Sequence, residues 1–220
     1  MIKLEDIVKI YNGSRKEIIA LDHITMNIKQ GEMVAVVGTS GCGKSTLLNI
    51  MGGMDQATSG RYYFDGTDVA GLGMNKLHRF RKENIGFVFQ NFALINRCTV
   101  YENLEIPLLA RRQRQYKNKI MDCLERLGIA ECAKSLPQDL SGGQQQRCAI
   151  GRALMTDCKL LLCDEPTGAL DSVTTKEIMD IFCDMNGSRT IVIATHDAEV
   201  ACRCGRVIHM KDGKLSEDQE

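Results

Sequence analysis

The stretch Met33 to Asn49, MVAVVGTSGCGKSTLLN, constrains the fold of this chain most strongly. It begins with five apolar residues, Met33 to Val37, which are rich in valine and bounded by Gly31 and Gly38. This run is too short for an ordinary helix, and its composition favours a strand that is buried on both faces. A glycine-rich loop follows the strand directly. The stretch therefore predicts a strand, a loop and then a helix over Lys44 to Met51.

The loop has the pattern G-x-x-x-x-G-K-[ST], which is typical of a phosphate-binding loop. Its glycines let backbone N–H groups turn inward around an anion, and the helix that follows points its positive end at the same place. Lys44 can reach the β- and γ-phosphates, and Ser45 can bind Mg²⁺. The residues predicted to contact the phosphates are Gly38, Thr39, Ser40, Gly41, Cys42, Gly43, Lys44, Ser45 and Thr46.

Length and charge exclude several classes of protein. The chain has 220 residues, of which 44% are hydrophobic, enough for the core of one α/β domain. Lys and Arg together number 28, as do Asp and Glu, so no overall charge attracts nucleic acid or anionic lipid. A run of 18 apolar residues and a basic-then-apolar leader are both missing, so we expect any membrane role to depend on a partner.

The ten cysteines sit mostly in apolar stretches and are expected to be buried free thiols in a reducing cytosol. Cys202 and Cys204 form a C-x-C without a second pair at metal-ligand spacing, which disfavours a zinc site.

Short apolar runs and one long helical stretch predict the architecture. Buried strands are expected at Ile85 to Phe89, Leu160 to Cys163 and Ile191 to Thr195, with further strands in residues 2–10 and 20–28. Residues 91–140 have helical spacing instead. We expect an α/β fold: a P-loop NTPase core with a mostly parallel sheet, amino-terminal antiparallel strands and a helical insertion. This would be one domain, with the core in residues 1–90 and 156–220 and the helical subdomain in about 91–155.

Polar side chains follow the predicted core strands. Gln90 ends the first, Asp164 and Glu165 end the second, and His196 ends the third. Because ligands of α/β sheets bind at the carboxyl ends of the strands, these side chains are expected beside the phosphate loop. One of the adjacent carboxylates can hold Mg²⁺ while the other polarises the attacking water. His196 alone would more often be structural.

Three further segments leave alternatives open. Ser141 is a plausible helix N-cap before Gly142 and Gly143, which predicts a second helix amino terminus built to receive an anion. Tyr11, before the turn at Asn12, is either a surface for stacking adenine or an ordinary residue at a strand end. The basic cluster Arg111 to Lys119 either faces phosphate headgroups of a membrane or is a solvated helix face.

The motifs GTSGCGKST, LSGGQ, LLLCDE and ALD, together with Gln90 and His196 and in this order along the chain, resemble the ATP-binding cassette of ABC transporters. The resemblance implies ATP and Mg²⁺ as ligands. It places Tyr11 on adenine, Lys44 on phosphate, Ser45 and Asp164 on Mg²⁺, Gln90 at Mg²⁺ and the attacking water, Glu165 as the base, His196 on the γ-phosphate, Asp171 of ALD at the nucleotide, and Ser141, Gly142, Gly143 and Gln144 on ATP held by a second cassette.

Within that family, the stretches STLLNIMGGMDQATSG, NIGFVFQNFALI, YENLEIPLL and CDEPTGALDS are most similar to the branch with macrolide-efflux, lipoprotein-release and antimicrobial-peptide-resistance ATPases. The resemblance implies a head-to-tail homodimer, an integral membrane permease subunit as partner, no nucleic acid partner, and a cytoplasmic location on the inner face of the cell membrane. Gly151 stands where alanine is usual and is expected to cost about 1 kcal/mol of helix stability.

Two rival functions remain. A soluble ABC ATPase of DNA repair or translation would call for a long coiled coil, zinc ligands or a second cassette, which the sequence lacks. A non-hydrolysing regulatory module is disfavoured because Glu165 and His196 are both present.

Overall fold

A six-stranded sheet forms the centre of the molecule, which is a computed structural model that describes residues 1–13, 16–185 and 187–217. Its strand order is β10-β9-β3-β8-β7-β6, and every pair is parallel except β9 with β10. The strands are β3 (Met33–Val37), β6 (Ile85–Val88), β7 (Leu160–Asp164), β8 (Thr190–Thr195), β9 (Arg206–Lys211) and β10 (Lys214–Glu217). The carboxyl ends of four parallel strands, β3, β8, β7 and β6, therefore lie along one edge.

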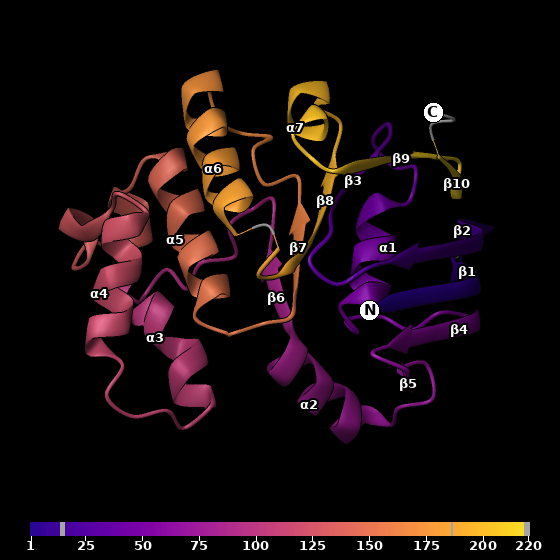
Figure 1. The fold of residues 1–220 in the computed structure, drawn as a ribbon, viewed down its shortest axis with the longest axis horizontal. Helices are drawn as coiled ribbons and strands as arrows, with labels where there is room; N and C mark the ends of the chain where they lie inside the picture. The colour runs from indigo at the N-terminus through magenta and orange to yellow at the C-terminus, as the bar shows by residue number, and fades with distance from the viewer. Residues whose placement is uncertain (14–15, 186, 218–220) are drawn as a thin grey trace.

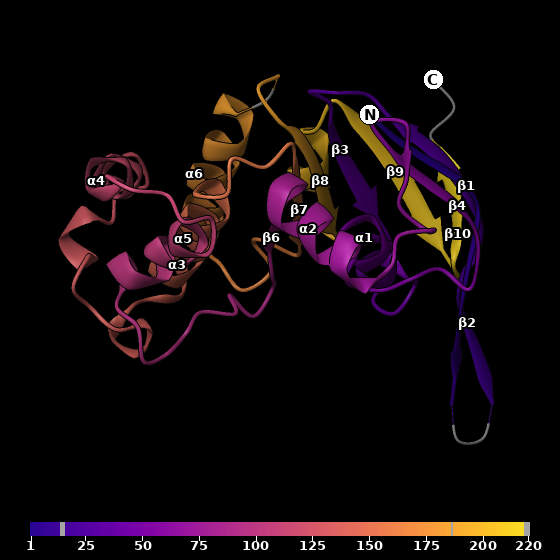
Figure 2. The same ribbon diagram turned by 90° about the horizontal axis from the view of Figure 1, so that it is seen from below.

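A second sheet is antiparallel and has the order β2-β1-β4-β5. Its strands are β1 (Ile2–Asn12), β2 (Glu17–Ile28), β4 (Ser59–Phe64) and β5 (Thr67–Asp68). The far end of the β1–β2 pair projects beyond the rest of the molecule (Figure 2).

Seven helices are described in the resolved ranges of the chain, and they cover both faces of the central sheet (Figure 1). They are α1 (Lys44–Met51), α2 (Met74–Asn84), α3 (Val100–Ala110), α4 (Lys117–Arg126), α5 (Gly142–Leu154), α6 (Ser172–Asp184) and α7 (Ala198–Cys202), with 3₁₀ turns at Ala130–Cys132 and Pro137–Asp139.

The two faces of the central sheet belong to two hydrophobic clusters. Leu160 and Leu162 face a cluster with α1, α2 and the antiparallel sheet, whereas Leu161 and Cys163 face a cluster with α3 to α6. This alternation follows from the period of two residues along a strand. The second cluster runs without a break from the helical insertion onto the sheet, so the insertion shares its core with the rest of the fold.

The expected fold class is confirmed: a mostly parallel core sheet, antiparallel amino-terminal strands and a helical insertion. The strand at Met33–Val37 and the helix at Lys44–Met51 have the predicted bounds. The division at about residues 91 and 155 stays a prediction. Helix α2 was not expected, although Leu77 and Phe80 of its buried face stand three residues apart.

The expectation that the basic cluster is a solvated helix face is wrong for most of its residues, whereas contact with membrane headgroups stays a prediction. Arg111 to Tyr116 form the connection between α3 and α4, and only Lys117 to Lys119 are helical. Gln113 N donates back to Leu108 O at 3.0 Å, and this hydrogen bond holds the connection in a turn after α3. Separately, no helix of the described ranges has both the length and the apolar character needed to cross a bilayer.

Candidate active site

A cavity of about 770 Å³ lies at the carboxyl edge of the central sheet, where the phosphate loop joins β3 to α1. Residues from the loop, from the ends of β6, β7 and β8, and from β2 surround it. They are Ile18, Ile19, Ala20, Thr39, Ser40, Gly41, Cys42, Gly43, Lys44, Ser45, Thr46, Gln90, Asp164, Glu165, His196, Asp212 and Gly213. The structure thus brings together the loop and the strand-end side chains that the sequence predicted.

The backbone of the phosphate loop leaves no room for side chains at two of its glycines. A Cβ on Gly38 would lie 2.2 Å from Met210 O, and one on Gly43 would lie 2.4 Å from Ala20 O. Gly43 is also the N-cap of α1 at φ 113°, and no side chain caps that helix. The first N–H groups of α1 therefore stay available for an anion at the positive end of the helix.

Lys44 is buried and is held in place by the loop. Its Nζ donates to Gly38 O at 2.7 Å and to Thr39 O at 3.2 Å, and it lies 3.5 Å from Oε1 of Glu165. The other carboxylate oxygen of Glu165 lies 2.9 Å from Nδ1 of His196. Glu165 thus stands between the two groups expected to contact phosphate.

Glu165 owes this position to an unusual backbone conformation. Its φ is +47°, in the left-handed region, immediately after the strand residue Asp164. Its backbone N donates to Ala194 O at 2.9 Å, which ties the turn to β8. Non-glycine residues adopt this region at a cost that the surrounding structure has to offset.

Asp164 fits a divalent cation. Its Oδ1 is buried without a hydrogen-bond partner among the described residues, and a buried carboxylate oxygen normally has one. The pKa of Asp164 is raised, chiefly because the carboxylate is buried, although a hydrogen bond from Ser45 acts in the opposite direction. A hydroxyl and a carboxylate oxygen together are ligands that Mg²⁺ accepts. Gln90, whose side chain also lines the cavity, could supply an amide oxygen.

Tyr11 lies beside the cavity rather than in its lining. Its hydroxyl donates to Asp55 Oδ2 at 2.8 Å, and Nζ of Lys9 lies 4.8 Å from the centre of its ring. Partial burial and this hydrogen bond both raise the pKa of Tyr11. Tyr11 pairs directly with Ile18 across the β1–β2 ladder, so their side chains share a face of the sheet. Ile18 and Ile19 are 60% and 56% exposed and both line the cavity, and Ile18 extends the face of Tyr11 as an apolar surface.

The second helix amino terminus forms as expected, with Ser141 as the N-cap of α5. Gln144 N donates to Ser141 Oγ at 3.3 Å, and Ser141 N donates to Gln144 Oε1 at 2.9 Å. This reciprocal pair is a capping box, which the S-x-x-Q spacing could have predicted. Gly143 has a packing role as well, since a Cβ there would lie 2.8 Å from Thr174 Cγ2 on α6.

The structure does not bring this helix end to the phosphate loop of its own chain: Ser141, Gly142, Gly143 and Gln144, all within the described ranges, are absent from the cavity lining. Asp171 is absent from the lining as well. It caps α6 instead, accepting from Val173 N and Thr174 N at 3.0 Å each.

Sequence reasoning missed Asn103, which is fully buried in α3. Its side-chain amide donates to Ile95 O, Cys98 O and Thr99 O and accepts from Ile95 N at 2.9 Å. The segment after Gln90 is thereby fixed to the helical insertion. A polar residue between the apolar Val100 and Leu104 was the signal in the sequence.

The fold and this cavity define a P-loop ATPase cassette: a glycine-rich phosphate loop, a carboxylate whose buried oxygen lacks a partner among the described residues, an adjacent carboxylate and a histidine at one sheet edge. The sequence profile of the ABC transporter family matches residues 21–168, more than half of the chain. The chain belongs to the ABC transporter family, as its ATP-binding cassette.

Similar proteins include the macrolide export ATP-binding/permease protein MacB of Hyphomonas neptunium, 42% identical over 223 residues and 99% of this chain. MacB of Shigella flexneri is 43% identical over 220 residues, 98% of this chain. The chain spans 34% of the length of each of these relatives, about a third.

Two similar solved structures align with this chain over 100% of its length and over 100% of the length of the solved chain. One is the dimeric structure of MJ0796, described as a bacterial ABC transporter cassette, with a TM-score of 0.93 and 40% identity. The other is a dimeric post-hydrolysis state of MJ0796 bound to ADP and Pi, with a TM-score of 0.93 and 39% identity.

Proposed function

We propose that this chain binds Mg-ATP in the 770 Å³ cavity and hydrolyses it to drive an integral membrane permease. The observation that carries the proposal is the position of Glu165, between Lys44 and His196 and directly after Asp164. Lys44, the loop N–H groups and His196 would bind the phosphates from one side. Glu165 would accept the proton of the attacking water, and Gln90 would orient that water.

The residues that would hold Mg²⁺ are Ser45, Asp164 and Gln90. When bound, the ion would supply positive charge that offsets the negative charge of the phosphates. The orphaned oxygen of Asp164 supports this assignment. Tyr11, with Ile18 beside it, would stack on adenine, because the Asp55 hydrogen bond holds its ring in place.

We further propose that two copies assemble head to tail around two ATP molecules. The capping box at Ser141 presents N–H groups at a helix amino terminus, yet in the described chain it stands apart from its own phosphate cavity. A second copy could place its residues 141–144, and Asp171, on the ATP held by the first, which closes a symmetric pair. The dimeric MJ0796 structures support this arrangement.

The cargo is proposed from the relatives. Because the similar MacB proteins are macrolide export proteins, we propose export, with macrolides as candidate cargo. Lipoproteins and antimicrobial peptides are further candidates, which rest on the motif resemblance alone. The chain would then lie in the cytoplasm on the inner face of the membrane, attached only through the permease.

Purification of the tagged chain from its native membrane tests this function. We expect a permease to copurify and the chain to hydrolyse ATP only with a divalent cation present. The rival, a soluble ATPase of DNA repair or translation, predicts capture of nucleic acid or ribosomes instead. Absence of ATP hydrolysis with the permease bound would contradict the proposal.

A further inference from the structure

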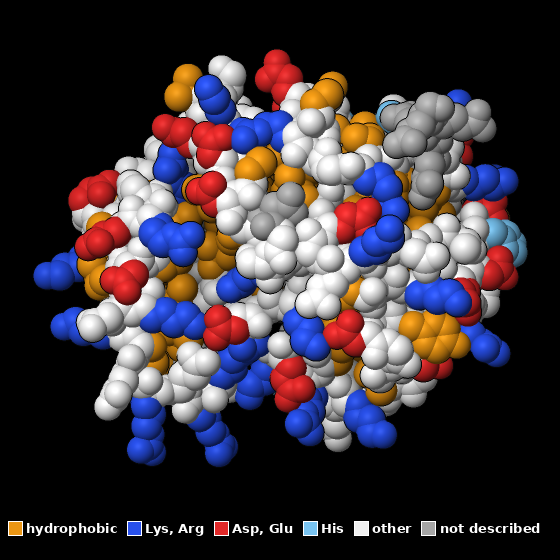
Figure 3. Space-filling model, viewed as in Figure 1, with side chains coloured by type: hydrophobic (Ala, Val, Ile, Leu, Met, Phe, Trp, Pro, Cys, Tyr) orange, Lys and Arg blue, Asp and Glu red, His pale blue; other side chains and the backbone are white. Residues whose placement is uncertain are grey.

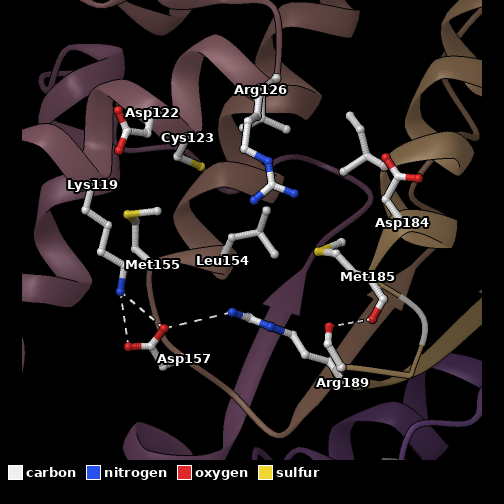
Figure 4. A pocket seen from close by; sticks show the side chains of 13 residues that line it. Lys119, Asp122, Cys123, Arg126, Leu154, Met155, Asp157, Asp184, Met185 and Arg189 are labelled. Atoms are coloured by element: carbon white, nitrogen blue, oxygen red, sulfur yellow. Dashed lines mark hydrogen bonds and ion pairs between the residues drawn. The ribbon is translucent and has the colours of Figure 1, made fainter.

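A second cavity, of about 460 Å³, lies at the opposite edge of the central sheet from the phosphate loop. Asp157 and Arg189 line it just before β7 and β8 begin, whereas Asp164 and His196 stand at the other ends of the same strands. Its walls come from α4, from the end of α5 and from the end of α6 (Figure 4). A cleft of this size suits a small organic ligand.

The floor of the cavity is apolar. Met155 and Met185 are buried beneath it, and Leu154 is half-buried at its side. In the view of Figure 1, apolar side chains lie recessed among basic and acidic ones over α4, α5 and α6 (Figure 3). The methionine side chains can adapt their shape to a bound apolar group.

The basic side chains around this floor outnumber the acidic partners that they contact. Asp157 Oδ1 and Oδ2 accept from Lys119 at 3.2 and 3.1 Å, and the same carboxylate lies 3.9 Å from Arg189. One carboxylate is thus shared by two cations and offsets the charge of only one of them. Arg126 adds a third cation, which has no hydrogen bond or ion pair in the described part of the chain.

Arg126 is placed to meet a ligand. Its guanidinium extends from α4 into the space between Leu154 and Asp184, above the apolar floor (Figure 4). Asp184 carries the opposing charge at the rim and forms no ion pair with Arg126 in the described structure. Asp122, one turn earlier on α4, points away from this space (Figure 4). A planar guanidinium with free donors binds a carboxylate or sulfonate through two parallel hydrogen bonds.

We propose that this cavity binds a small amphiphilic organic anion, with its carboxylate or sulfonate on Arg126 and its apolar body on Leu154, Met155 and Met185. The anionic group satisfies the free donors, and the apolar body removes the exposed floor from water. Because the cavity and the phosphate loop lie at opposite edges of the sheet, this ligand and ATP bind without competing.

The probe is anilinonaphthalene sulfonate, whose fluorescence rises when its rings leave water, titrated into the full chain. N-phenylnaphthylamine has the same rings without the sulfonate and serves as the matched neutral probe. We expect the sulfonate to bind at one site about threefold to tenfold more tightly than the neutral probe. Saturating Mg-ATP should leave its affinity unchanged.

Two substitutions that are expected to change sulfonate binding in opposite directions distinguish this site from general adsorption of the dye. Arg126→Gln should remove the advantage of the sulfonate and leave the neutral probe unaffected. Asp184→Asn should strengthen sulfonate binding, since a like charge is lost at the rim. Arg114→Gln, which changes an exposed arginine outside the cavity, should have no effect. Arg126 and Asp184 are exposed, so neither change disturbs the core.

Equal sulfonate affinity in Arg126→Gln and in the unmodified chain would overturn the proposal. So would displacement of the dye by Mg-ATP, which would place it at the phosphate loop. Circular dichroism confirms that each variant is folded, and a chain that does not bind the dye at low ionic strength would also refute the site.

Discussion

Nζ of Lys44 lies 3.5 Å from Oε1 of Glu165, so the lysine of the glycine-rich loop and the proposed base form one largely buried ion pair. The two side chains are only 7% and 11% exposed, and His196 holds the second oxygen of the carboxylate. For Lys44 to contact phosphate, part of its interaction with Glu165 has to be exchanged for a phosphate oxygen. If ATP binds at this loop as proposed, its binding would therefore be coupled to the position of Glu165.

Lys44→Ala is expected to weaken Mg-ATP binding greatly and to abolish turnover. The change removes the cation at the loop and leaves Glu165 buried without its partner, facing the negative γ-phosphate. Calorimetry with Mg-ATP measures the affinity. Lys159→Ala is the matched control, because Lys159 pairs with Asp65 away from the cavity and its loss should leave affinity unchanged. Unaltered ATP affinity in Lys44→Ala would show that the loop is not the phosphate site.

Tyr11→Ala should weaken ATP binding by about fivefold to a hundredfold, the range for losing one base stacked on an aromatic ring. Tyr11→Phe keeps the ring and loses only the hydrogen bond to Asp55, so its effect should be much smaller. Affinities for ATP measured in all three chains separate stacking from anchoring. If Tyr11→Phe is as weak as Tyr11→Ala, the hydrogen bond to Asp55 and not the stacked ring carries the contribution of Tyr11.

The segment after Gln90 is expected to dock the membrane subunit. Ile95 and Leu109 are 44% and 54% exposed there. The buried side chain of Asn103 fixes the backbone of the segment through hydrogen bonds with N and O of Ile95. A photo-reactive amino acid at Ile95 should cross-link to the copurified permease. The same group at the exposed Ser188, near the opposite sheet edge, should not. Failure at every position from 91 to 109 would rule out docking here.

Gln146→Leu should stabilise the fold, because both polar atoms of this fully buried amide have no partner among the described residues. An apolar side chain of similar size removes that penalty, which is about 1–2 kcal/mol in the free energy of unfolding. Gln145→Leu is the control and should destabilise, since Gln145 Nε2 donates to Leu140 O at 3.2 Å. Urea unfolding of both variants gives the comparison. Destabilisation by Gln146→Leu would mean that the amide has a partner.

The parts of the site that the sequence predicts are those with local signals. The phosphate loop and the residues after β6, β7 and β8 can be placed because parallel strands end at one edge. Ser141 is recognisable as a helix start because the S-x-x-Q spacing of a capping box is a local sequence signal. Ile18 meets the phosphate loop only in the folded structure, so the apolar pattern around it does not reveal a role at the cavity. Asn103 bonds to residues four to eight positions before it, and its only signal in the sequence is a polar side chain within an apolar stretch.

Gly151 shows how packing changes the meaning of a residue. Its effect on helix propensity is readable from the sequence, but a Cβ there would lie 2.8 Å from Leu127 Cδ1 and 3.0 Å from Leu104 Cδ2. The space that a methyl group at position 151 would need is therefore occupied by Leu127, at the end of α4, and by Leu104 of α3. Only the packed structure reveals that the glycine lets these helices approach α5.

The central claim is that Glu165 is the base of an ATP site completed by a second copy. Glu165→Gln should keep ATP binding and lower turnover by about 10²-fold to 10⁴-fold, since the amide cannot accept the proton. It also removes a negative charge facing the γ-phosphate and releases Lys44 from its ion pair, so the ATP-bound dimer should become tighter.

Sedimentation of Glu165→Gln, with and without saturating Mg-ATP, tests this claim most directly. We predict an ATP-dependent doubling of mass that Ser141→Arg abolishes, because the larger side chain fills the second helix amino terminus. Ser141→Ala, which loses the same capping bond to Gln144 N without adding bulk, should still permit the dimer. A Glu165→Gln chain that stays monomeric at saturating ATP, or that hydrolyses ATP at the unmodified rate, would contradict both the base and the shared site.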